Sequence, residues 1–171
     1  MSQVDKEIGI EGYLTSTRGI NGKIKVYPED FVVTEVSLPL PEGDSHTILE
    51  IRSVNWETHA LAEKLKKFLG QERIRLAFAG TKDKRSISTQ WFSISSHLER
   101  EEIEKAIEKL PGVELLGLRH SGRGLYLGDL LGNMFTIAVR MHDNDEERFK
   151  ETLDQVLSTG GFPNFFERQR F

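Results

Sequence analysis

The chain has 171 residues, a length typical of one domain, and it is 37% hydrophobic and 29% charged, like an ordinary globular protein. It contains no cysteine, which excludes disulfides, thiolate metal sites, iron–sulfur clusters and cysteine nucleophiles. Its net charge is −4, so a nucleic-acid-binding role would require cations that gather locally. The sequence has neither a long apolar run nor an N-terminal signal pattern, so we expect a cytoplasmic protein with no membrane partner.

The first elements predicted along the chain are two short strands within residues 23–36, separated by a turn at 28–30. A loop over residues 38–44 then leads into a more regular series. That series consists of a strand at 46–54, a helix at 56–69, strands at 74–78 and 89–94, a helix at 101–110 and a strand at 113–119. We expect Asn55 to cap the first helix and Gly70 to end it.

This β-α-β-β-α-β order over residues 46–120 is the ferredoxin-like arrangement. A further strand at 135–141 and a helix at 145–157 are predicted after it. The predicted fold class is therefore α+β, with a mostly antiparallel mixed sheet and helices on one face. The glycines, proline and aromatic residues at 160–166 are unlike a solvated tail, and we interpret the chain as cut within a structural unit.

Cofactor and metal motifs are not found. No two of the five histidines have the spacing of helical metal ligands, so no metal site is predicted, although a site assembled in space stays open. The glycine-rich stretch at 122–128 is one residue too long for a dinucleotide fingerprint, and residues 80–82 lack the upstream glycine of a phosphate-binding loop. We therefore expect no metal and no nucleotide cofactor.

The densest polar segment is residues 79–85, where Asp83 lies among Lys82, Lys84 and Arg85. Neighbouring cations favour the ionised form of a carboxyl group, so Asp83 is expected to be a carboxylate at neutral pH. Such a carboxylate suits a nucleophile or base that acts beside a phosphate backbone held by the cations. The alternative is a charged hairpin tip whose surface ion pairs contribute little.

Other cations fall in three further groups. These are Lys23 with Lys25, then Arg119, His120 and Arg123, and finally Arg168 with Arg170. If the sheet brings the groups together, an acidic chain acquires a basic face for RNA, and nearby aromatic side chains could stack on bases. If it does not, each group is an ordinary solvated loop.

Residues 78–84, with Thr89 and Gln90 after them, resemble the signature of the tRNA pseudouridine synthase D (TruD) family. Three further blocks resemble the family in the same order, at residues 25–35, 127–135 and 163–171. In the last block, Phe165 stands where the family often has tyrosine and Glu167 where it usually has glycine. Four ordered blocks make the resemblance specific, whereas a single block would not.

The resemblance implies roles for individual residues. Asp83 is the expected catalytic aspartate, and Lys25 has a supporting ionic role beside it. Phe31, Asn133 and Phe135 are expected around the target uridine. We also assign Lys82, Lys84, Arg85 and Gln90 to substrate binding, the cations through the phosphate backbone and Gln90 as part of the matched block.

The resemblance further implies that residues 1–171 are the N-terminal part of a pseudouridine synthase-like catalytic domain, whose C-terminal half and inserted domain lie beyond this chain. The implied reaction is isomerisation of a tRNA uridine, expected at position 13, to pseudouridine without a cofactor. Either a covalent or a glycal intermediate is compatible with one aspartate. The competing hypotheses are a non-catalytic ferredoxin-like RNA-binding module and a purely structural interaction domain.

Overall fold

The structure is a computed structural model that describes residues 6–7, 9, 12–70, 74–141 and 145–162. The chain divides into two compact units. The larger unit is formed by Ile24–Val139, and the smaller unit combines Met1–Lys23 with Arg140–Phe171. No helix among the described residues is both long and apolar enough to cross a membrane.

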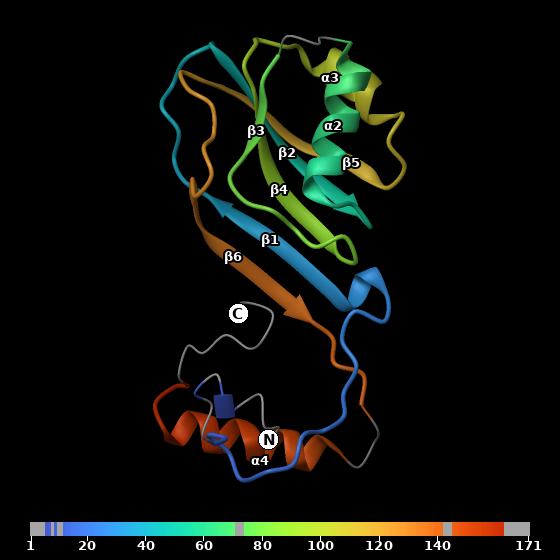
Figure 1. Ribbon diagram of the computed structural model, residues 1–171. Helices are drawn as coiled ribbons and strands as arrows, with labels where there is room; N and C mark the ends of the chain where they lie inside the picture. Colours follow the sequence, from blue (N-terminus) through green and yellow to red (C-terminus); the bar gives the residue numbers. More distant parts are fainter. Residues whose placement is uncertain (1–5, 8, 10–11, 71–73, 142–144, 163–171) are drawn as a thin grey trace. The chain divides into compact units, whose positions relative to one another are not determined.

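The larger unit contains one six-stranded sheet and two α-helices (Figure 1). Its elements in chain order are the 3-10 helix η1 (Pro28–Asp30), β1 (Phe31–Ser37), β2 (His46–Val54), α2 (Thr58–Leu69), β3 (Leu76–Phe78), β4 (Ile87–Ile94), α3 (Arg100–Ile107), β5 (Val113–Ser121) and β6 (Leu130–Ile137). The strands follow the order β5-β2-β4-β1-β6, and β3 pairs with β4. All pairs are antiparallel except β1 with β4, so the sheet is mixed but mostly antiparallel, as predicted.

Strand β4 organises the sheet, because one of its edges is shared by two strands. Its first half pairs in parallel with β1, with Val32 opposite Ile87. Its second half pairs with β3, with Phe78 opposite Phe92. The loop of residues 79–86, which joins β3 to β4, therefore leaves the sheet near the place where β3 gives way to β1.

The hydrophobic core lies between the sheet and the two helices. Strands β2 and β4 contribute Leu49 and Phe92, which have 0% exposure. Alternate residues of each strand point to this same face of the sheet. Helix α2 contributes Leu61 and Leu65, and α3 contributes Ile103. Both helices thus cover one face of the sheet, which confirms the predicted α+β class. The element order over residues 46–120 is the β-α-β-β-α-β order of the predicted ferredoxin-like unit. The assignment of residues 1–171 to the N-terminal part of a catalytic domain stays a prediction.

Several predicted boundaries are wrong. Residues 23–27 form no strand apart from one bridge between Lys23 and Arg140. Asn55 does not cap α2, because its φ of 61° lies in the left-handed region, and the cap is Glu57. The last strand of the unit occupies Leu130–Ile137 rather than 135–141, since its pairing with β1 begins at Leu130 opposite Ser37. Gly70 does end α2 as predicted, with a φ of 67°.

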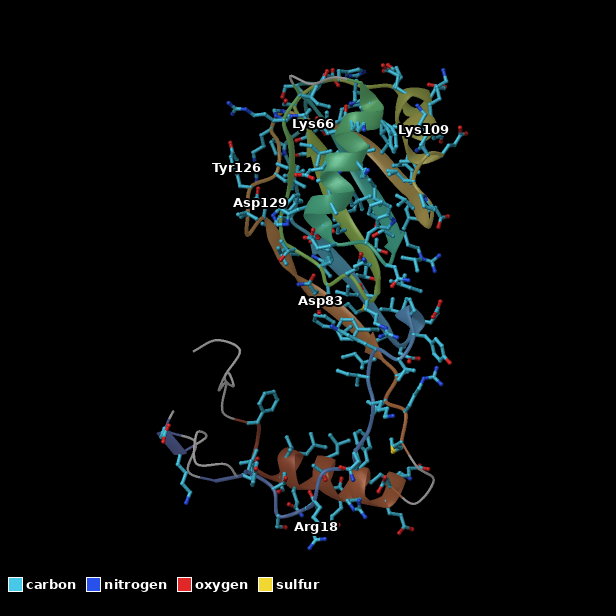
Figure 2. All side chains as sticks on the ribbon, turned by 45° about the vertical axis from the view of Figure 1, so that its right-hand side comes forward. Arg18, Lys66, Asp83, Lys109, Tyr126 and Asp129 are labelled. Carbon is cyan, nitrogen blue, oxygen red and sulfur yellow. The ribbon has the colours of Figure 1, made fainter. Side chains whose placement is uncertain are left out.

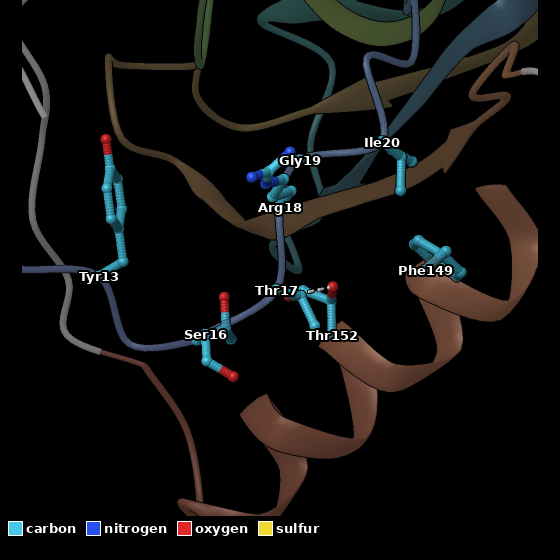
Figure 3. Close-up of a pocket in the computed structure, with 9 residues that line it drawn as sticks. Tyr13, Ser16, Thr17, Arg18, Gly19, Ile20, Phe149 and Thr152 are labelled. Carbon is cyan, nitrogen blue, oxygen red and sulfur yellow. Dashed lines mark hydrogen bonds between the residues drawn. The ribbon is translucent and has the colours of Figure 1, made fainter.

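The smaller unit is built on α4 (Glu146–Ser158) and the described residues of the N-terminal segment that ends at Lys23. The hydroxyl groups of Thr17 and Thr152 are 2.6 Å apart, and the backbone N–H of Ser16 donates to the side chain of Gln155 at 2.8 Å. A hollow lies along this contact and is lined by residues 13 and 15–20 with Phe149 and Thr152 (Figure 3). Among the described residues, no carboxylate lines it. The final predicted block at 163–171, with Arg168 and Arg170, lies outside the described residues.

Candidate active site

Asp83 lies in the loop between β3 and β4, and its side chain is 69% exposed (Figure 2). Its carboxylate forms an ion pair and hydrogen bond with the ammonium group of Lys25, which precedes η1 and β1. An ion pair this accessible to water contributes at most about 1 kcal/mol to folding. Asp83 is therefore a solvent-accessible carboxylate that contacts Lys25. It is not buried, so its main role is not to stabilise the fold.

Two aromatic rings, those of Phe31 and Phe135, lie next to this ion pair. The Lys25 ammonium lies 4.0 Å from the centre of the Phe31 ring, a cation–π contact. Phe31 in turn meets Phe135 edge to face, with ring centres 5.8 Å apart. Phe135 remains 54% exposed although it belongs to a strand. The structure thus joins Asp83, Lys25, Phe31 and Phe135, which come from three separate segments, into one contiguous group.

Asn133 lies on the same side of the sheet as Phe135, because alternate residues of a strand share a face. It lies two residues before Phe135 on β6, and it is opposite Glu35 of β1. Its side chain is exposed. The side of the sheet that carries Phe31, Asn133 and Phe135 is the one that α2 and α3 cover over β2 and β4.

The loop that carries Asp83 is held from beneath by buried polar groups. The backbone N–H of Lys82 donates to the Thr58 hydroxyl at 2.7 Å, and that hydroxyl donates to the Gln90 side chain at 3.0 Å. The Gln90 amide then donates to the Gly80 carbonyl at 3.0 Å. Thr58 and Gln90 are each 1% exposed. These bonds fix Gly80 and Lys82, the two neighbours of Thr81, to the interior. Asp83 follows them on the exposed part of the loop.

A buried ion pair adds a second support. The Lys82 ammonium lies 2.5 Å from a carboxylate oxygen of Glu35, and the two side chains are 5% and 0% exposed. The other carboxylate oxygen of Glu35 accepts the backbone N–H of Trp91 at 3.3 Å. Buried charges persist when they are paired and hydrogen-bonded, as here. This pair connects the loop to β1, which also carries Phe31.

The residues assigned to substrate binding thus fall into two groups. Lys82 and Gln90 are buried and bonded within the protein, so the sequence-based picture of Asp83 surrounded by three surface cations was incomplete. Lys84 and Arg85 are exposed. The Arg85 guanidinium donates to the Val26 carbonyl, and both cations line a shallow hollow with Tyr27.

Among the described residues, the predicted cationic group of Arg119, His120 and Arg123 does not form a single face. The Arg119 guanidinium stacks on Trp91 at 4.7 Å, on the sheet face opposite the helices. His120, the next residue on β5, points to the other face. Arg123 forms an ion pair with Asp129 at 2.5 Å, and this hydrogen bond is the main reason that the pKa of Asp129 is lowered.

Sequence reasoning missed two residues of the site. Thr58 begins a helix, and Glu35 lies within an apolar strand, so neither has a local pattern that reveals a buried polar role. Glu35 belongs to the matched block at residues 25–35, but block membership alone does not predict its pairing with Lys82. Only the topology, which sets β1 beside β4, could reveal that contact.

Comparison with known proteins gives one consistent family. The family model described as tRNA pseudouridine synthase D (TruD) matches residues 7–171. A protein of Archaeoglobus fulgidus named tRNA pseudouridine synthase D is 41% identical over 98% of this chain, which covers 40% of the relative. A protein of the same name from Methanococcoides burtonii is 42% identical, with 98% of this chain and 39% of the relative covered.

A solved structure agrees with the sequence relatives. The crystal structure of a protein from Methanosarcina mazei, named tRNA pseudouridine synthase D (TruD), superposes with a TM-score of 0.84 at 38% sequence identity. The match covers 99% of this chain and 39% of that protein. The chain therefore spans about two fifths of the length of the relatives that it matches.

Proposed function

The chain belongs to the tRNA pseudouridine synthase D (TruD) family, and from this premise we propose that its protein isomerises a tRNA uridine to pseudouridine with Asp83 as the catalytic carboxylate. The observation that carries the proposal is the exposed Asp83 carboxylate, paired with Lys25 on a loop anchored to the interior. The family resemblance extends the proposal to uridine 13 and to a cytoplasmic enzyme.

The reaction breaks the C1′–N1 bond of the uridine, turns the detached uracil and joins C1′ to C5, which then loses its proton. In one route the Asp83 carboxylate attacks C1′ and is later displaced by C5. In the other it takes a proton from C2′ to form a glycal as uracil leaves, and it returns the proton to C2′ as C5 joins C1′. Both routes require a carboxylate, and the ammonium group of Lys25 forms an ion pair with the carboxylate of Asp83.

The target base must leave its stack to meet Asp83. We assign Phe31 and Phe135 to packing against the flipped uracil, because their edge-to-face pair lies beside Lys25 and Phe135 is half exposed. Asn133 can offer its amide to the uracil edge from the same side of β6. Lys84 and Arg85 are exposed for phosphate contact, whereas Lys82 and Gln90 contribute by holding the loop.

The test measures tritium release from tRNA labelled at uracil C5, because the label leaves when C5 becomes bonded to carbon. The protein from its complete reading frame is compared with Asp83→Ala and with Glu63→Ala, an exposed acid on α2. We expect release to vanish in Asp83→Ala, with tRNA binding retained, and to persist in Glu63→Ala.

Two results would count against the proposal. If the complete protein releases no tritium from any tRNA pool, a non-catalytic RNA-binding module becomes the better hypothesis. If Asp83→Ala loses tRNA binding and turnover equally, Asp83 has a structural role instead.

A further inference from the structure

Three side chains that are distant in the sequence meet at one corner of the larger unit. Asp44 precedes β2, His97 lies between β4 and α3, and His120 is near the end of β5. One ligand atom from each of the three lies within 4.8 Å of the other two. None of these residues takes part in the candidate active site.

The sheet and one loop contact bring them together. His120 pairs with Thr47 across β5 and β2, so it lies beside the start of β2, just after Asp44. The Thr47 hydroxyl donates to the Ser96 carbonyl and accepts the backbone N–H of Leu98, each at 2.8 Å. Because Thr47 holds the residues on both sides of His97, it fixes that loop over His120.

His120 offers a ring nitrogen that the protein leaves unsatisfied. Its Nδ1 atom is buried and has no hydrogen-bond partner among the described residues. Leaving a buried polar atom unpaired costs about 1–3 kcal/mol, so such an atom calls for an explanation. The ring stacks on His97, with ring centres 3.9 Å apart and planes inclined by 7°, and stacking does not satisfy Nδ1.

One ring nitrogen of His97 contacts a carboxylate, as is common for histidines that bind metals. Its Nε2 lies 3.2 Å from a carboxylate oxygen of Glu99. Histidines that bind metals commonly donate the N–H of one ring nitrogen to a carboxylate, which leaves the other nitrogen for the ion. The contact between Nε2 and Glu99 leaves Nδ1 of His97 as the nitrogen that could bind an ion.

From these contacts we propose that Asp44, His97 and His120 bind a divalent transition metal ion, with Zn²⁺ as the first candidate. Two imidazoles and one carboxylate suit Zn²⁺ better than Mg²⁺ or Ca²⁺, which prefer oxygen ligands. Three protein ligands leave one tetrahedral position for water. No histidine spacing predicted this site, because its ligands come from a loop, a turn and a strand end.

Binding requires a local adjustment. Ligand atoms around a tetrahedral Zn²⁺, at zinc–nitrogen distances of about 2.1 Å, lie roughly 3.4 Å from one another, and the three ligand atoms here lie within 4.8 Å of one another. Parallel stacked rings also cannot direct both nitrogens at one ion, so the His97 ring must turn from His120. The side chain of His97 is 44% exposed and Asp44 is exposed, which allows both to move toward the half-buried His120.

The test is Zn²⁺ titration of the metal-stripped protein, expressed from its complete reading frame without a histidine tag. The variants are Asp44→Asn, His97→Asn and His120→Asn. The matched control is His59→Asn, because His59 is also exposed and paired with a carboxylate, that of Glu57. Co²⁺ is titrated in parallel, since its visible absorption reports four-coordinate binding.

We expect one Zn²⁺ equivalent whose affinity falls about tenfold or more in each site variant and in Glu99→Gln, the range seen when outer-shell partners are removed. Affinity in His59→Asn is expected to match that of the parent protein. Zn²⁺ should also raise the unfolding temperature of the parent but not of the site variants.

The proposal is overturned if the parent binds no Zn²⁺, or if Asp44→Asn and His97→Asn bind it as tightly as His59→Asn does. These two variants decide the matter even if His120→Asn fails to fold, because both replace exposed side chains.

Discussion

Glu35 and Lys82 place a full charge of each sign in the interior of the larger unit. A buried pair contributes little net stability, because desolvation offsets the attraction between the charges. Removing only one partner is different, since it leaves the other charge buried without compensation. Lys82, which precedes Asp83 in the chain, is therefore held to β1 by a contact in which each charge depends on the other.

The first prediction concerns this pair. Glu35→Gln and Lys82→Met should each lower the free energy of unfolding by about 3–5 kcal/mol, because each strands one buried charge. The double variant should lose less than the sum, because it removes both charges. Urea unfolding of the four proteins measures this coupling. Additive losses would show that the two side chains do not interact energetically.

At the scale of one element, α2 begins on a carboxylate cap. Glu57 accepts the backbone N–H groups of His59 and Ala60, each at 3.0 Å, and it also pairs with the His59 ring at 2.8 Å. The hydrogen bond from the His59 backbone is the main cause that lowers the pKa of Glu57 from 4.5 to about 2. Asn55, the expected cap, instead occupies a left-handed turn.

The second prediction is the pH dependence of this cap. Because the folded pKa is lowered, the stabilisation by Glu57 is complete above pH 4.5 and is lost as the pH falls toward 2. Glu57→Ala should cost about 1 kcal/mol at neutral pH, a typical cap contribution. Its difference from the parent protein should shrink over that acid window. A pH-independent difference in denaturant unfolding would argue against the cap.

At the scale of the whole molecule, the proposed binding of tRNA by an acidic chain depends on where its exposed cations lie. Lys84 and Arg85 are exposed beside Asp83, whereas Lys82 and Arg123 are paired with carboxylates. Lys109 lies at the end of the unit remote from Asp83 (Figure 2). Charge position, rather than net charge, should therefore determine the affinity for tRNA.

The third prediction follows from that distribution. Lys84→Ala and Arg85→Ala should each weaken tRNA binding and reduce the slope of log affinity against log salt by about one unit. Lys109→Ala should change neither quantity. Filter binding from low to moderate salt measures the slopes. Unchanged slopes in the first two variants would exclude this loop from the RNA contact.

The sequence predicted the parts of this molecule that depend on local patterns. Alternation gave the bounds of β2, and a glycine able to adopt positive φ gave the end of α2. Asp83 and Lys25 came from motif resemblance, and the structure pairs them. The role of Lys82 could not be predicted, because its charge suggests a surface position until β1 supplies Glu35. The cluster of Asp44, His97 and His120 likewise depends on strand order.

The shared edge of β4 also has a consequence for how the protein folds. Strands β2 to β5 can assemble from neighbouring segments, whereas β1 pairs with β6 from the far end of the unit. Closing such a long loop costs entropy before its contacts form, so this pairing is expected late in folding. Strand β1 and the residues just before it carry both Glu35 and Lys25. The loop of Asp83 is therefore expected to be completed late in folding, and a partly folded chain presents no assembled candidate site.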